Sequence, residues 1–172
     1  MSGLQQWFSI ARLGVMIGLA AILAGGFGSV VAVSQDRGTA PPKDTIFARK
    51  ILMDAIGHNM DELETNASSQ KVDLTEGKDH ADIVSVMLMA FPHLFPPATN
   101  QWKPNVQRDP GTDTFAAPEV WTNYADFYKR SREAADVAYK ASRANTDVQF
   151  KDFIGQLRVA CDSCHGIYMK QD

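Results

Sequence analysis

The residues best suited to chemistry lie near the end of the chain, which reads Cys161-Asp162-Ser163-Cys164-His165. Two thiols three positions apart lie on the same side of a helix and can form thioethers with the two vinyl groups of one porphyrin. The adjacent His165 is then placed to give an imidazole nitrogen to the iron. The spacing therefore predicts one covalent haem c, with Cys161 and Cys164 as attachment points and His165 as proximal axial ligand.

Two other kinds of site use closely spaced thiols. A dithiol redox pair is typical of chains with a βαβ pattern, and a structural zinc site needs further thiols or paired histidines. Cys161 and Cys164 are the only cysteines in the chain, and signals for strands are essentially missing. The haem interpretation is therefore favoured over both alternatives.

The N-terminal segment carries the signals of export. Between Arg12 and Asp36 lie 23 uncharged residues, mostly aliphatic or glycine. Such a run can span a bilayer as a helix, and Trp7 beside Arg12 suits the membrane interface. Arg12 would stay in the cytoplasm, so the remainder of the chain would be exported. We expect residues 1–33 to form a single transmembrane anchor.

A cleaved signal peptide would also fit this segment, because small residues at Ala32 or Ser34 suit a cleavage site. Both interpretations place the haem domain in the bacterial periplasm, where haem is attached to thiols outside the cytoplasm. The domain would be held at the inner membrane if residues 1–33 are retained, and would be soluble if they are removed. Residues 34–43 are then a linker, and residues 44–172 form one domain.

Charge gives little guidance to partners. The net charge of −3 offers no reason to expect nucleic acid, so any membrane contact would be through the N-terminal helix.

Apolar residues recur at helical spacing in four segments. We expect the first helix to begin near Asp44, the second to cover about residues 75–94, the third to begin at Pro118 and the fourth to follow a capping box at Thr146 and Gln149. The stripes contain Met53, Ile56, Met60, Leu63 and Ala67; Ile83, Val86, Met87, Ala90, Phe91 and Leu94; Trp121, Tyr124, Phe127, Ala134, Ala138 and Ala141; and Phe150, Phe153, Ile154, Leu157, Ala160, Cys161, Cys164 and Tyr168. The pattern predicts an all-α antiparallel four-helix bundle with a cofactor between facing helices.

Several separated pieces resemble the class II c-type cytochromes, the cytochrome c-prime family. Residues 51–60, Ile-Leu-Met-Asp-Ala-Ile-Gly-His-Asn-Met, are similar to the first-helix motif of its low-spin branch. Leu94-Phe95-Pro96 is similar to the end of its second helix, and Pro118-Glu119-Val120-Trp121 to the opening of its third. The haem motif at the end of the chain completes this order. The resemblance implies a monohaem cytochrome, an axial methionine in the first motif, and a homodimer formed through the first two helices.

The chain departs from the family pattern after the haem histidine. Met169 stands where a basic residue is expected, and Lys170 follows one position later.

Met53 is the candidate for the second axial position. In an antiparallel bundle the end of the last helix lies beside the start of the first, and the heights of His165 and Met53 along their helices agree within a turn. Met60 lies about 10 Å further along, and His58 points about 140° away from Met53 around the helix. Met53 could instead only pack against the porphyrin, because methionine is a flexible residue that fills gaps in cores.

These site residues suggest two functions. With Met53 and His165 both on the iron, the protein would carry single electrons between respiratory or photosynthetic complexes, with redox protein partners in or at the inner membrane. Without Met53, a five-coordinate iron under an apolar pocket built from Leu52 and Ile56 would bind NO or CO.

An enzyme is not expected. A peroxidase would need a distal His and Arg pair, whereas Arg49 has no accompanying histidine and is expected on a surface neighbouring that of Met53.

Overall fold

The computed structural model describes residues 40–104 and 115–170. The predicted anchor or signal at residues 1–33 and most of the linker at residues 34–43 lie outside the described residues. Within the described ranges, none of the helices combines the length and the apolar character needed to cross a membrane.

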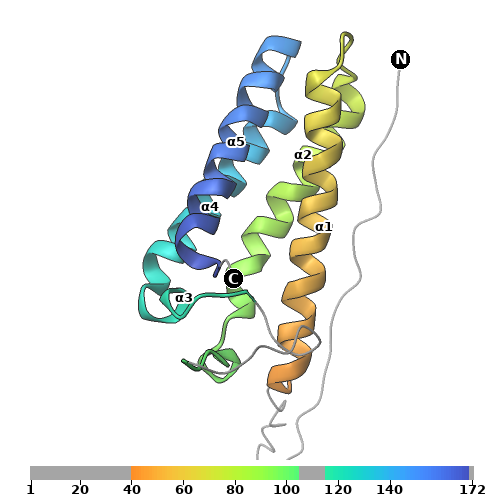
Figure 1. The fold of residues 1–172 in the computed structure, drawn as a ribbon. Coiled ribbons are helices and arrows are strands. Elements are labelled where there is room, and N and C mark those ends of the chain that lie inside the picture. Colours follow the sequence, from red (N-terminus) through yellow and green to blue (C-terminus); the bar gives the residue numbers. More distant parts are fainter. Residues whose placement is uncertain (1–39, 105–114, 171–172) are drawn as a thin grey trace, which may run out of the picture. The chain divides into compact units, whose positions relative to one another are not determined.

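Four long helices form the bundle shown in Figure 1, namely α1 (Pro42–Ser68), α2 (Leu74–Ala90), α4 (Tyr124–Ser142) and α5 (Asp147–Tyr168). Three short elements lie between α2 and α4: the 3-10 turns Phe91–Leu94 and Pro97–Thr99 and the single-turn helix α3 (Glu119–Thr122). The described residues contain no strand, only an isolated bridge between Ala116 and Met169. The prediction of an all-α four-helix bundle is confirmed.

Local capping signals set the starts of the helices. The Asp73 carboxylate accepts hydrogen bonds from the backbone N–H groups of Thr75 and Glu76 at the start of α2. At the start of α5, Thr146 Oγ1 accepts from the Gln149 N–H at 3.2 Å, and Gln149 Oε1 accepts from the Asn145 N–H at 3.0 Å. The predicted capping box is therefore present, although its return bond reaches one residue further back.

Two helix boundaries differ from the sequence prediction. The first helix begins at Pro42 rather than at Asp44, which lies in its first turn and suits the positive end of the helix dipole. The helix expected after Pro118 is broken at Asn123, whose φ of −127° and ψ of 42° separate α3 from α4. Asparagine tolerates this break because its side chain readily forms local or tertiary hydrogen bonds in place of helical ones.

Side-chain hydroxyl groups join α2 to α4 near the point where a proline ends α2. Pro92 has no backbone N–H, so it cannot donate to the Leu88 carbonyl four residues earlier. Ser131 of α4 donates its hydroxyl to that carbonyl at 2.6 Å instead. One turn away, Ser85 of α2 donates to the Ala135 carbonyl at 2.9 Å. The two buried hydroxyl groups fix the register of α2 against the alanine-rich face of α4.

The start of α2 packs very closely against the start of α5. Phe150 is fully buried, and Gly77 lies directly against its ring. A Cβ atom added at Gly77 would lie 2.5 Å from Phe150 Cζ, which is shorter than any van der Waals contact. The absence of a side chain at Gly77 therefore permits this approach.

We predict that Gly77→Ala destabilises the protein by about 1–3 kcal/mol, because the buried ring must move to admit the methyl group. Gly155→Ala is the matched control: its added Cβ meets nothing within 4 Å. At that helical position alanine should stabilise by about 0.5–1 kcal/mol. Urea unfolding followed by far-ultraviolet circular dichroism measures both changes, and equal effects of the two substitutions would contradict the packing argument.

Candidate haem site

A cavity of about 330 Å³ opens between α1, α4 and α5. This volume lies within the range of sites that hold small molecules and cofactors. Of the neighbouring long helices, α1 and α5 make the least extensive contact with each other. The cavity lies between these two helices. Its walls contain all four residues that the sequence nominated, Cys161, Cys164, His165 and Met53.

The α5 wall carries the three residues of the attachment motif, each of them half-buried. Burial raises the pKa of the Cys161 thiol, and burial together with the neighbouring Cys161 raises the pKa of Cys164 to about 11. Both sulfurs are therefore held uncharged, as they are in a thioether. Burial lowers the pKa of His165, which favours the neutral imidazole that a metal needs as ligand.

The α1 wall carries Met53, Ile56 and Met60. The structure thus brings Met53 and His165 to one cavity, as the height argument required. Met60, about two turns further along the same face of α1, lines the cavity as well. His58 is exposed and is not among the lining residues.

Arg49 is a cavity residue that the sequence argument put on the wrong surface. It is only 3% exposed, and its NH1 group donates to Thr99 Oγ1 at 3.0 Å. Its guanidinium carbon lies 4.6 Å from the centre of the Phe95 ring. Arg49, Met53 and Ile56 follow the same four-then-three spacing as the rest of the stripe, and this spacing was the signal that could have placed Arg49 correctly.

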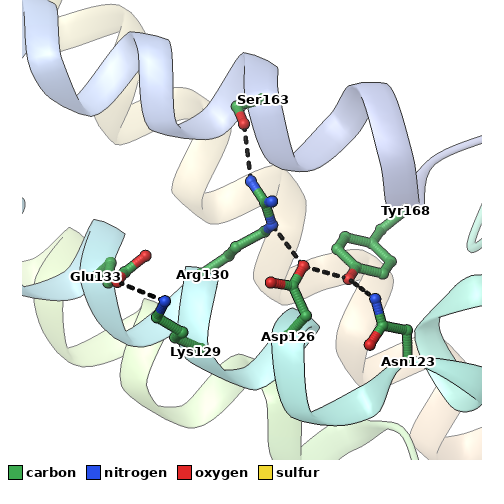
Figure 2. Close-up of polar contacts among 7 residues, drawn as sticks. All are labelled: Asn123, Asp126, Lys129, Arg130, Glu133, Ser163 and Tyr168. Atoms are coloured by element: carbon green, nitrogen blue, oxygen red, sulfur yellow. Dashed lines mark hydrogen bonds and ion pairs between the residues drawn. The ribbon is translucent and has the colours of Figure 1, made fainter.

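Two further arginines border the cavity, and the sequence did not indicate either of them. Arg158 of α5 donates through Nε to the Glu64 carboxylate of α1, which holds the pKa of Glu64 below its ordinary value. Arg130 of α4 donates to Asp126 of the same helix and to Ser163 of α5 (Figure 2). The members of each inter-helical contact are far apart in the chain, so no local spacing reveals them.

The residues present fit a covalently bound haem. Two neutral thiols and one neutral imidazole project from successive turns of α5 into a cavity whose α1 and α4 walls offer mainly apolar groups, among them Ile56, Phe127 and Ala134. A zinc site is not supported, because no group of three His, Cys, Asp or Glu side chains converges within the described residues. When bound, the haem supplies an iron that changes oxidation state or binds a small ligand.

Comparison with known families decides which class of protein has this site. The family model for cytochrome c' matches residues 44–169. The chain belongs to the cytochrome c' family. The cofactor is accordingly one covalent c-type haem, as the motif predicted. The roles of Cys161, Cys164, His165 and Met53 within the site stay predictions, and no comparison supports assignment to the low-spin branch.

Solved cytochrome c' structures share the fold. The protein from Thermochromatium tepidum aligns with a TM-score of 0.68 at 20% identity, over 78% of this chain and 100% of that one. A cytochrome c' described as having an unusual ligand-controlled dimer dissociation gives a TM-score of 0.65 at 20% identity, with the same coverage of both chains. The nitric oxide complex of a point mutant of cytochrome c' from Alcaligenes xylosoxidans gives 0.65 at 18% identity, again over 78% and 100%. No curated protein matches the chain.

We predict that the Arg158–Glu64 pair makes stability depend on pH. The pKa of Glu64 lies below its ordinary value of 4.5, so the contribution of the pair is complete above that pH and is lost as the pH falls through the lowered pKa. Both side chains are 39% exposed, so the contribution should not exceed about 1 kcal/mol. Urea unfolding of wild type and Glu64→Gln should differ at pH 7 and converge at an acid pH below the lowered pKa of Glu64.

The matched control for this prediction is Glu133→Gln, which breaks an exposed pair with Lys129 within α4. It should change stability by only a few tenths of a kcal/mol at pH 7, roughly the value of such a helical pair. An equal difference between wild type and Glu64→Gln at both pH values would refute the assignment.

Proposed function

We propose that this protein binds NO or CO at its haem iron. The observation that carries the proposal is the chemistry of the α1 wall, whose buried residues Ile56 and Met60 offer only hydrocarbon and thioether groups. Arg49, a buried donor on the same wall, is held by Thr99 through NH1 and NH2. A wall whose buried surface is mainly hydrocarbon and thioether stabilises bound dioxygen less than a polar wall would, which favours NO and CO.

The nitric oxide complex of the Alcaligenes xylosoxidans mutant supports this proposal, since that protein has the same fold.

A second candidate function, electron transfer, is favoured by one observation: Met53 lines the same cavity as His165. If its sulfur held the iron opposite His165, no position would be open to a ligand, and the protein would exchange single electrons with redox partners at the inner membrane. A thioether ligand would also raise the reduction potential. Neither candidate function is enzymatic.

Replacing Met53 separates the two functions, because leucine keeps about the same volume and removes the sulfur. For NO or CO binding we expect a high-spin ferric spectrum in the wild type, and Met53→Leu should change the CO affinity less than about threefold (0.7 kcal/mol). The measurements are electron paramagnetic resonance, near-infrared absorption and CO titration of the ferrous protein.

The opposite outcome would identify an electron carrier. It consists of a low-spin wild-type spectrum with a sulfur-to-iron band, lost in Met53→Leu, together with a gain in CO affinity of more than about tenfold (1.4 kcal/mol). Met60→Leu is the matched control, since it removes a second thioether from the same wall.

The site chemistry also supports a proposal for the location of the protein. Because haem is attached to thiols outside the cytoplasm in bacteria, we propose that the haem domain lies in the periplasm, with residues 1–33 as an anchor or a cleaved signal.

We further propose a homodimer formed through α1 and α2. These two helices pack against each other, and each carries an exposed apolar pair one turn apart: Phe47 and Ile51 on α1, and Ile83 and Val86 on α2. Exposed apolar surface of this kind is typical of an interaction site. The relative with ligand-controlled dimer dissociation supports the formation of a dimer.

We predict that a Phe47→Lys, Val86→Lys double variant sediments as a monomer at concentrations where the wild type is a dimer, because two charges would have to be buried in the interface. Val148→Lys is the matched control, since Val148 is more exposed than either residue but lies at the start of α5. Analytical ultracentrifugation of the holoprotein measures the change. A dimer that survives the double variant would refute this interface.

A further inference from the structure

We propose that Arg130, Asp126 and Tyr168 form a polar clamp that positions the haem-attachment turn of α5 and sets the reduction potential of the haem. The proposal rests on the haem at Cys161 and Cys164. It does not depend on whether Met53 coordinates the iron, so it applies equally to a gas-binding protein and to an electron carrier.

The first half of the clamp joins α4 to the residue between the two cysteines. Arg130 Nε donates to Asp126 Oδ2 at 2.6 Å, one turn earlier on α4. Its NH1 group donates to Ser163 Oγ of α5 at 2.9 Å (Figure 2). The guanidinium group is planar and rigid, so two bonds in different directions fix its place between the helices. The Cys161–Cys164 turn is thereby held to α4.

The second half holds the end of α5. The Tyr168 hydroxyl donates to the same Asp126 oxygen at 2.6 Å, and Asn123 Nδ2 donates to the Tyr168 hydroxyl at 3.3 Å (Figure 2). Tyr168 is 4% exposed, and its ring centre lies 5.2 Å from that of Phe127. The helix is therefore tied to α4 two residues before His165 and three residues after it, which restrains the backbone that carries the imidazole.

The positive charge of the clamp borders the cavity, whereas its negative charge does not. Arg130 lines the cavity together with Cys164 and His165, whereas Asp126 is not among the lining residues. The bonds from Tyr168 and Arg130 hold the pKa of Asp126 below its ordinary value, and burial raises the pKa of Tyr168 to about 12. At neutral pH the clamp thus holds one positive charge at the cavity wall and one negative charge behind it.

This order has a consequence for electron affinity. A fixed positive charge disfavours the ferric state, which carries one more positive charge than the ferrous state, and so raises the reduction potential. The Asp126 carboxylate acts in the opposite sense and partly offsets it. Removing the cation or the anion should therefore move the potential in opposite directions.

The test is a spectroelectrochemical titration of the haem-loaded protein and its variants. Arg130→Met should lower the potential, because the Asp126 carboxylate is left without its cation. Asp126→Asn should raise it, because the arginine is no longer offset. At a fixed applied potential we expect several-fold changes in the ratio of reduced to oxidised protein, in opposite directions.

Two further variants separate charge from position. Arg130→Lys keeps the charge but loses the rigid fork, so it should leave the potential close to that of the wild type. The same variant should shift the low-frequency resonance Raman bands of the ferrous haem, which respond to the thioether attachments whether or not Met53 coordinates the iron, because Ser163 is released. Lys129→Met is the matched control: it removes a positive charge from the neighbouring position of α4, where the side chain is 70% exposed, and should change neither readout.

Potentials that move in the same direction in Arg130→Met and Asp126→Asn would overturn the proposal, since general loosening of the bundle would explain them. An effect of Lys129→Met as large as that of Arg130→Met would also overturn it. If Arg130→Met fails to retain haem, the shift in Asp126→Asn compared with Lys129→Met decides the matter. The outcome is separate from that of the Met53→Leu experiment, which reads spin state and CO affinity.

Discussion

The burial of α5 is the constraint on which the site depends. The first half of this helix places Phe150, Ile154 and Leu157 in the core, where they are almost completely buried. The second half faces the cavity with Cys161, Cys164 and His165. Because one rigid helix contains both halves, the packing of its apolar side chains sets the place of the reactive groups.

Charged pairs surround this cavity at its border rather than in its interior. Arg158 ties α5 to Glu64 of α1, and Arg130 ties it to α4 through Ser163. All these side chains keep contact with water, which avoids the large desolvation cost of a fully buried ion pair. The buried wall is mainly apolar, with residues such as Ile56 and Ala134, although it also includes Arg49. A porphyrin in this cavity would therefore have a mainly apolar environment, with the polar contacts of Arg158 and Arg130 at its border.

The two proposed functions need the same architecture and differ in the role of one side chain, Met53. A sulfur from Met53 on the iron would close the last coordination position, whereas a methionine that only packs would leave it open. The bundle, the attachment motif and the Arg130 contacts are common to both cases. The function of such a protein therefore depends on a short-range bond whose formation is decided by a single flexible side chain.

Local signals in the sequence determined the class of the protein. The spacing of Cys161, Cys164 and His165 is sufficient for a covalent haem, and the period of the apolar stripes, with the Thr146 capping box, is sufficient for the helices. Tertiary structure decided what depends on neighbours distant in sequence. It buried Arg49 against Thr99, brought Met60 into the cavity, broke the third helix at Asn123, and joined Arg130 to Ser163. Periodicity and capping act within a few residues, whereas these contacts form only after the helices have packed.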